Sequence, residues 1–333
     1  MNSAFARQTL RRQQGAALLL AMLTVALVAT LAAGAAWQQW RAIEIETAER
    51  QRVQASWILT GALDWSRLIL REDARANRNS GNADHLGEPW ATPLEEARLS
   101  SFLAVDKDNN ADEDVMEAFL SGEIIDAQSR LNFANLTKRV GGRDNAVHIV
   151  ISTEDLQTFK RLFETLGLPP EELENAANLM ARSADLAIND PKPSATPLVP
   201  TRYSQLSWLG LSDATLATIE PYVTMLPERS KLNINTASAE VLSAVIEGMD
   251  LALAQYLVAQ RAVTPMGTVE DLQRLTPTLS EEAIDADLLD VRSRYFEVRG
   301  RLRLDNTIIE ERSLVSRRGL FMQVVWRERM KGG

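Results

Sequence analysis

The sequence predicts an α+β fold with a long N-terminal helix, antiparallel strands and a large inserted all-α domain. Three observations lead to this prediction. Residues 16–36 form an uncharged apolar run whose helical pattern continues to Ile69. Residues 152–289 are mainly helical in pattern, and residues 295–304 alternate apolar and polar side chains as a half-buried strand does. Helices placed between two sets of strands are expected when an all-α domain is inserted into an α+β domain.

The apolar run at residues 16–36 is long enough to cross a membrane, since about 20 apolar residues span the hydrocarbon core. Arg7, Arg11 and Arg12 precede it, and the positive-inside rule keeps that end in the cytoplasm. We therefore expect the bulk of the chain on the far side of the membrane. A cleavable secretory signal is the alternative, because the small residues 33–35 could form its cleavage site.

The helical pattern beyond the run favours a retained anchor over a cleaved signal. Apolar residues recur at three- and four-residue steps from Trp40 to Ile69, and no Pro or Gly lies between Ala35 and Thr60. A secretory signal has no reason to continue into a long amphipathic helix. Trp37 and Trp40 also lie where an interfacial aromatic belt is expected.

The stretch RRQQGAALLLAMLTV, residues 11–25, resembles the class III leader of type IV pilins and type II secretion pseudopilins. A short basic leader ends in Gly15, and an apolar helix begins at Ala16. The resemblance implies that a prepilin peptidase cleaves between these two residues and that Ala16 is then methylated. Most pilins carry Glu at the fifth mature position, where this sequence has Leu20. The absence of this glutamate is typical of the K-type minor pseudopilins. It removes the carboxylate that would pair with a neighbouring subunit's N-terminal amine.

Strand-like segments lie on both sides of the helical block. EIIDAQSRLNFANL, residues 123–136, precedes it, and Ser152 and Asp155 have the spacing of a capping box that opens its first helix. After it, an antiparallel meander of three strands is predicted, with turns at Asp305-Asn306 and Arg318-Gly319.

This order resembles type II secretion protein K over nearly the whole chain. The resemblance implies a type IV pilin-like fold, in which the long N-terminal helix packs on an antiparallel sheet. The expected parts are a leader (1–15), the transmembrane part of the helix (16–36), a first pilin-like part (37–145), the inserted helical domain (146–290) and the C-terminal pilin-like strands (291–333).

The helical block contains a repeat that resembles helix-hairpin-helix (SAM-like) units. In the clearer copy, which begins LNINTASAEV, we expect Asn235 or Thr236 to cap a helix and Gly248 to lie in the hairpin. A weaker copy earlier in the chain has Gly210 at the corresponding position. The simplest interpretation is a pair of small helical bundles that act as a scaffold.

Nucleic-acid binding by these units, in a membrane-anchored protein, is the alternative function. DNA-binding relatives of the motif present backbone amides to phosphate through a Gly-apolar-Gly turn. Here Asp250 replaces the second glycine and places a carboxylate where phosphate would bind. The formal net charge of −9 also repels a polyanion, so we expect no nucleic acid among the partners.

An acidic stretch, DKDNNADEDVME, is a candidate calcium site because hard cations favour carboxylate and amide oxygens. Its candidate ligands are Asp106, Asp108, Asn110, Asp112, Asp114 and Glu117. Ala111 stands where an EF-hand needs Gly, which favours a calcium loop of another geometry. The resemblance also points to calcium, since pseudopilins are often calcium-stabilised. A solvated acidic turn is the alternative.

No catalytic constellation is evident, and we expect no enzyme. His85 and His148 are isolated in the sequence, and His148 is expected to be a packed strand residue. The chain has no cysteine, which excludes thiolate catalysis and cysteine-type zinc sites.

The resemblance implies a minor pseudopilin at the tip of the periplasmic pseudopilus, where it starts or caps fibre assembly for protein secretion. The implied partners are minor pseudopilins I and J, with H as a further candidate, the major pseudopilin and the prepilin peptidase. The implied location is the bacterial inner membrane, crossed once, with the C-terminal bulk in the periplasm.

Overall fold

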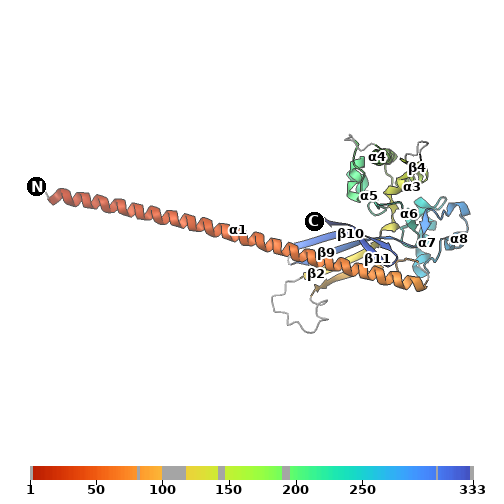
Figure 1. The fold of residues 1–333 in the computed structure, drawn as a ribbon, viewed down its shortest axis with the longest axis horizontal. Coiled ribbons are helices and arrows are strands. Elements are labelled where there is room, and N and C mark those ends of the chain that lie inside the picture. The colour runs from red at the N-terminus through yellow and green to blue at the C-terminus, as the bar shows by residue number, and fades with distance from the viewer. Residues whose placement is uncertain are drawn as a thin grey trace, which may run out of the picture. The chain divides into compact units, whose positions relative to one another are not determined.

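The computed structural model describes residues 3–80, 83–99, 118–141, 147–189, 196–304 and 307–330 (Figure 1). The chain divides into two compact units, residues 1–58 and 59–333. Helix α1 (Ser3–Ser80) supplies the first unit and the opening of the second. The segment Ala16–Asn77 contains a stretch that is long and apolar enough to cross a membrane, and this stretch is fully exposed.

A five-stranded antiparallel sheet forms the first layer of the second unit. Its order is β1-β2-β9-β10-β11. The strands are β1 (Leu94–Arg98), β2 (Ala118–Asp126), β9 (Tyr295–Leu304), β10 (Thr307–Arg318) and β11 (Phe321–Met330). The last three strands form the predicted meander, and β2 pairs with β9 although most of the helical block separates them in sequence. The predicted turn at residues 305–306 lies outside the described residues.

The C-terminal part of α1 packs on one face of this sheet. Leu63 and Leu70 of α1 share a core with Trp90, Phe296 and Met322. Trp90, in the short helix η1 (Pro89–Ala91), meets Phe296 edge to face with ring centroids 5.2 Å apart. The predicted packing of a long helix on an antiparallel sheet is therefore confirmed.

The helix comes very close to the sheet at a glycine in β9. A Cβ added at Gly300 would lie 3.2 Å from Cδ2 of Leu59, and Gly300 pairs with Gly122 of β2. A Cβ at Gly300 would therefore press on α1, and one at Gly122 would lie only 2.7 Å from the carbonyl oxygen of Arg299 in β9.

Strand β9 is buried on both faces at its start, which the alternating pattern did not predict. Tyr295 and Glu297 were expected on the solvent side, but both are buried. Tyr295 joins a small core with Leu226 and Leu314 on the second face of the sheet. Glu297 is balanced by Arg130, at 3.1 Å, and by Arg299, at 2.6 Å.

The helical body follows β2 and has its own large core. Its helices are α3 (Thr153–Thr165), α4 (Pro170–Asn189), α5 (Asp213–Ile219), α6 (Ala239–Val245), α7 (Leu251–Val263) and α8 (Glu270–Leu275). The 3-10 turns η2 (Ala127–Ser129), η3 (Phe133–Leu136), η4 (Tyr203–Leu209) and η5 (Glu281–Ala283) connect them. Phe133, Phe159, Phe163 and Leu257 are buried together in this core.

Short strand pairs tie the ends of the helical body together. Strands β3 (Leu131–Asn132) and β6 (Val223–Thr224) pair in parallel, as do β7 (Leu232–Asn233) and β8 (Leu289–Asp290). Strands β4 (Thr137–Gly141) and β5 (Val147–Ile151) form an antiparallel ribbon. The predicted domain boundary at 145/146 falls between β4 and β5, and the domain boundaries as a set stay predictions.

The predicted capping box at α3 does not form. Ser152 is the N-cap residue, but its side chain accepts no hydrogen bond from the helix. Instead, its Oγ donates to Oδ2 of Asp155 at 2.6 Å. Asp155 in turn accepts from Arg229 at 2.6 Å, so a distant arginine draws this carboxylate into a different network.

Candidate functional site

The residues predicted for processing lie near the start of α1. Gly15 and Ala16 are both helical, and the Leu20 side chain is 65% exposed. The large apolar side chains from Leu18 to Leu31 are exposed on all sides of the helix. A surface of this kind is covered in the working protein by lipid or by other apolar helices. Cleavage after Gly15 and methylation of Ala16 stay predictions.

The six candidate calcium ligands between Asp106 and Glu117 lie outside the described residues. A different carboxylate cluster lies within them. Oxygen atoms of Asp73, Asp84 and Glu88 lie within 4.8 Å of one another, and all three residues are buried. The guanidinium of Arg317 contacts both Asp73, at 2.8 Å, and Asp84. A protein cation therefore already occupies this cluster.

Burial changes the titration of two of these carboxyl groups, Asp73 and Asp84. Burial raises the pKa of Asp73 to about 7, helped by the charge of Glu88 and by a hydrogen bond with it, while Arg317 opposes the rise. Burial also raises the pKa of Asp84, against the charge of Arg317. One arginine does not balance three buried carboxyl groups, and the structure therefore favours a proton on Asp73 near neutral pH.

Asp126 joins the end of β2 to the helical body. Its carboxylate accepts from the backbone N–H of Gln128 at 2.8 Å and from the hydroxyls of Thr236 and Ser293, both at 2.6 Å. The amide of Asn233 donates to it at 3.0 Å. Burial raises the pKa of Asp126, and the hydrogen bonds from Ser293, Thr236 and Gln128 oppose that rise. The sequence alone gave no sign of this role.

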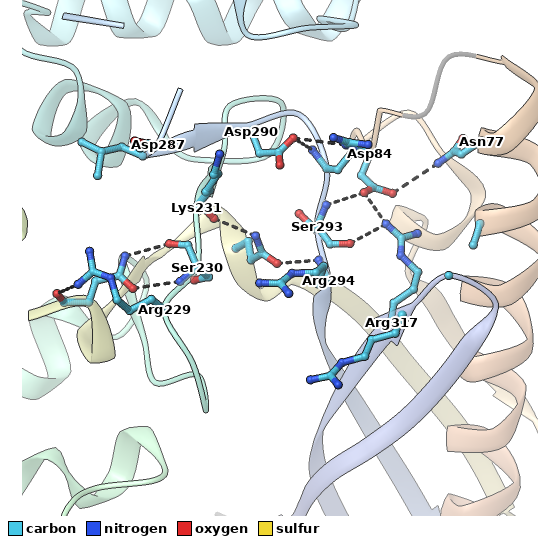
Figure 2. A pocket seen from close by; sticks show the side chains of 17 residues that line it. Asn77, Asp84, Arg229, Ser230, Lys231, Asp287, Asp290, Ser293, Arg294 and Arg317 are labelled. Carbon is cyan, nitrogen blue, oxygen red and sulfur yellow. Dashed lines mark hydrogen bonds and ion pairs between the residues drawn. The ribbon is translucent and has the colours of Figure 1, made fainter. Parts of the chain in front are cut away.

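Asn233 lies at the centre of this network, which we call the polar junction and define by Asp84, Asp126, Asn233, Thr236, Ser293 and Arg317. Its amide nitrogen lies 3.1 Å from the carbonyl oxygen of Asp84 and 3.0 Å from Oγ of Ser293. Figure 2 shows Asp84 between Ser293 and Arg317, with Asn77 of α1 beside it. The polar junction thus connects the sheet, the helical body and the loop after α1.

The cap predicted for α6 is wrong because other partners use those side chains, Asp126 for Thr236 and Met266 for Asn235. Ser238, not Asn235 or Thr236, is the N-cap residue of α6, and its hydroxyl accepts from Val241 N. Asn235 instead exchanges two hydrogen bonds with the backbone of Met266, at 2.8 and 2.9 Å. The same residue types, Asn and Thr, can cap a helix or hold a distant loop, and the sequence alone does not distinguish these two roles.

The two hairpin units share one turn geometry. Gly248, with φ of 78°, is followed by the buried Met249 and by Asp250, which caps α7 through Leu253 N at 2.7 Å. In the earlier unit, Gly210 has φ of 86°, and Ser212 caps α5. A left-handed residue favours Gly at both positions. Asp250 therefore satisfies one of the first amides of α7, the groups that would hold a phosphate in a DNA-binding unit.

Arg261 of α7 is a structural residue that the sequence did not reveal. Its guanidinium donates to the backbone carbonyls of Ile234 and Ala237, and only 6% of the residue is exposed. Burial lowers its pKa to about 10. This basic side chain is committed to the interior and is not available to an anionic partner.

The prediction that His148 is a packed strand residue is wrong. His148 lies in β5, but its side chain is 47% exposed and its Nδ1 lies 3.5 Å from Oδ1 of Asp185 in α4. Val147 and Val150 beside it are also exposed, because the β4-β5 ribbon is covered on only part of its surface.

Comparisons with known proteins agree with this architecture. A family model described as type II secretion system (T2SS), protein K, matches residues 232–292, which contain Asn233, Asn235 and both helices of the clearer hairpin unit. The structure is similar to a chain in "The Crystal Structure of the GspK-GspI-GspJ complex" from enterotoxigenic Escherichia coli. The TM-score is 0.64 at 18% identity, with 86% of this chain and 99% of that chain covered. The match confirms the predicted fold class.

Two curated relatives extend the similarity to most of the chain. Type II secretion system protein K of Pectobacterium carotovorum subsp. carotovorum is 30% identical, over 95% of this chain and 96% of its own. The Pseudomonas aeruginosa protein of the same name is 27% identical, over 86% and 84%. Because the similarity covers the apolar helix, the sheet and the helical body together, the chain belongs to the family of type II secretion system protein K.

Proposed function

We propose that this chain is a minor pseudopilin at the tip of the periplasmic type II secretion pseudopilus, where it starts or caps fibre assembly. The observation that carries the proposal is the similarity to protein K relatives over 95% of the chain. The similar structure belongs to a complex of three pseudopilins. On that basis the partners of this chain are minor pseudopilins I and J, with H and the major pseudopilin as further contacts.

The apolar part of α1 serves as a single-pass anchor in the inner membrane before assembly. Prepilin peptidase removes residues 1–15, and the amine of Ala16 is methylated. The second unit, residues 59–333, lies in the periplasm. Its role is structural rather than catalytic, since the buried carboxylates Asp73, Asp84 and Asp126 are held by hydrogen bonds and ion pairs within the fold.

The first experiment is to measure the intact mass and N-terminal sequence of the protein extracted from membranes. A start at methylated Ala16 is expected, and the extracted protein should co-purify with minor pseudopilins I and J. A start near Ala36, or an uncut chain, would contradict the processing step. Failure to recover I and J from cross-linked membranes would contradict the tip complex.

We also propose that the acidic stretch from Asp106 to Glu117 binds calcium. Five Asp or Asn side chains at two-residue spacing, followed by Glu117, form a donor set of the kind that hard cations prefer. Calcium at about 100 times its Kd is expected to raise the free energy of unfolding by about 2.7 kcal/mol. The double variant Asp108→Asn, Asp112→Asn should lose that increment.

Thermal unfolding in calcium and in chelator measures the increment directly. The matched control is the double variant Glu46→Gln, Glu49→Gln, which changes charge equally on an exposed part of α1. If the wild-type protein unfolds at the same temperature in both solutions, the calcium proposal is wrong.

A further inference from the structure

A cleft of about 720 Å³ opens beside the polar junction (Figure 2). Its walls come from the end of α1, the turn between β10 and β11, the segment just before β9 and the helical body. Its lining includes six cationic side chains and three carboxylates. The cations are Arg229, Lys231, Arg292, Arg294, Arg317 and Arg318. A cationic concavity is unexpected in a chain with a net charge of −9.

Two of the cleft carboxylates are already engaged by the fold. Asp84 accepts from Ser293 N at 2.6 Å and from Arg317. Asp290 accepts from the backbone N–H groups of Val291, at 2.8 Å, and Arg292, at 3.2 Å. Oδ1 of Asp290 also lies 3.5 Å from Nε of Arg292, so Asp84 and Asp290 each pair with one lining arginine.

Three arginines keep most of their surface in solvent. Arg292, Arg294 and Arg318 have side chains that are 56, 53 and 68% exposed. An arginine has five N–H donors, and few of theirs are used within the chain. They can therefore donate to a ligand without first breaking a buried contact.

One carboxylate oxygen serves two of these arginines. Oε1 of Glu228 lies 3.2 Å from Arg294 and 4.0 Å from Arg318, and it also accepts from the hydroxyl of Tyr295 at 2.7 Å. Lys231 donates to a neutral acceptor, the carbonyl of Ala286, at 2.6 Å. Among the other lining cations, Arg229 pairs with Asp155, and Arg317 pairs with Asp73 and Asp84. In the described part of the chain, the lining cations without an acid of their own are therefore Lys231 and the two arginines that share Glu228.

We propose that this cleft binds an acidic polypeptide segment of a partner protein, with Asp or Glu carboxylates of the segment against Arg292, Arg294 and Arg318. Bidentate pairing suits a guanidinium and a carboxylate. The volume lies in the range of pockets that enclose a drug-sized ligand, so it accommodates a short part of the segment.

A polypeptide fits better than a nucleic acid because of the charge of the whole chain. The excess of acid elsewhere repels a long polyanion, whereas a short acidic segment stays within about one Debye length, roughly 8 to 10 Å, of the arginines. This inference does not depend on placement at the pseudopilus tip.

The test uses the full chain in non-ionic detergent and a fluorescent peptide that alternates Asp and Gly. Fluorescence anisotropy should show binding that weakens as salt is added. The triple variant Arg292→Gln, Arg294→Gln, Arg318→Gln should bind about tenfold more weakly or worse, since three charge pairs are lost. The matched control is Arg50→Gln, Arg71→Gln, Arg274→Gln, which removes three exposed arginines outside the cleft and should keep wild-type affinity.

A second measurement uses only the wild-type protein and tests the proposal even if the triple variant fails to fold. The same peptide with Asn in place of Asp should show at least about tenfold weaker binding to the wild-type protein. Equal binding of the Asn peptide, equal binding by the triple variant, or equal weakening by the control variant would overturn the proposal. Polyphosphate that competes as well as the peptide at equal charge would also overturn it, because the cleft would then be a general anion site.

Discussion

Among single residues, Arg317 makes the burial of several acids possible. Its guanidinium contacts Asp73 and Asp84, donates to the carbonyl of Ser293 at 2.7 Å and lies 4.6 Å from the ring centroid of Phe296. Removal of one partner from a buried ion pair typically costs about 3 to 5 kcal/mol, since the other charge is left uncompensated. Its two carboxylates are not equivalent, because the pKa of Asp73 is raised to about 7.

The variant Asp73→Asn is expected to reduce the pH dependence of stability. The folded protein keeps a proton on Asp73 that the unfolded chain releases near pKa 3.8, so the free energy of unfolding falls as pH rises from about 4 to about 7. Asparagine has no proton to release, so this decrease in the free energy of unfolding disappears in the variant. The difference between the free energies of unfolding at about pH 5 and about pH 8 should shrink by roughly 1 to 3 kcal/mol.

Urea titrations at the two pH values measure this difference. Asp64→Asn is the control, because Asp64 lies on the same helix with a side chain that is 60% exposed. If Asp73→Asn leaves the pH dependence as steep as in the wild-type protein, the proton is not on Asp73.

The variant Asn233→Ala should destabilise the second unit by about 2 to 4 kcal/mol. It removes the amide donor to Asp126 and the acceptor of Asn235 N, and both atoms left behind are buried. Chemical unfolding of the full chain measures the loss. Asn178→Ala is the control, since Asn178 donates only to an exposed carbonyl of its own helix, and an equal loss in both variants would show that Asn233 has no special role.

At the scale of elements, the sequence pattern predicted the helices and strands that depend on interactions between neighbouring residues. The long helix and the C-terminal meander follow from side-chain periods of about 3.6 and 2, which depend only on neighbouring residues. The predicted helix caps were wrong where a distant residue bonds the capping side chain. Met266 bonds Asn235 in this way, and Arg229 bonds Asp155. Long-range partners are not visible in one sequence. The polar junction and the cationic cleft, which join segments from α1 to β10, therefore could not be predicted.

The hairpin turn between α6 and α7 gives a prediction at this scale. Gly248→Ala should cost about 1 to 2 kcal/mol, because φ of 78° disfavours an L side chain even though the nearest atom, Leu279 Cδ2, lies 3.8 Å from the added Cβ. Gly61→Ala should instead stabilise by about 0.5 to 1 kcal/mol, since Gly61 lies within α1 with no atom within 4 Å of the added Cβ. Thermal unfolding of both variants compares the two. A Gly248→Ala protein as stable as the wild type would show that the turn relaxes.

At the scale of the molecule, the two units suit different surroundings. The apolar part of α1 has no cover within the chain, whereas the second unit buries its own cores and ties them together through Asp126 and Asn233. An apolar helix without cover in its own chain is stable only where lipid or other apolar helices surround it. The position predicted to distinguish this subunit from an ordinary pilin lies in the apolar segment, at Leu20.

The variant Leu20→Glu tests that distinction in the assembled system. A carboxylate at this position could pair with the N-terminal amine of a neighbouring subunit, so we expect the variant to enter the fibre below the tip and to lower secretion several-fold. Leu19→Glu is the matched control, since it carries the same cost of about 2.5 to 3.5 kcal/mol for an acid in the membrane without the position that pairs. Cross-linking to minor pseudopilins I and J and assays of exported protein measure the two effects. If Leu20→Glu forms tip complexes and supports secretion as the wild-type protein does, the absence of the acid does not define the tip subunit.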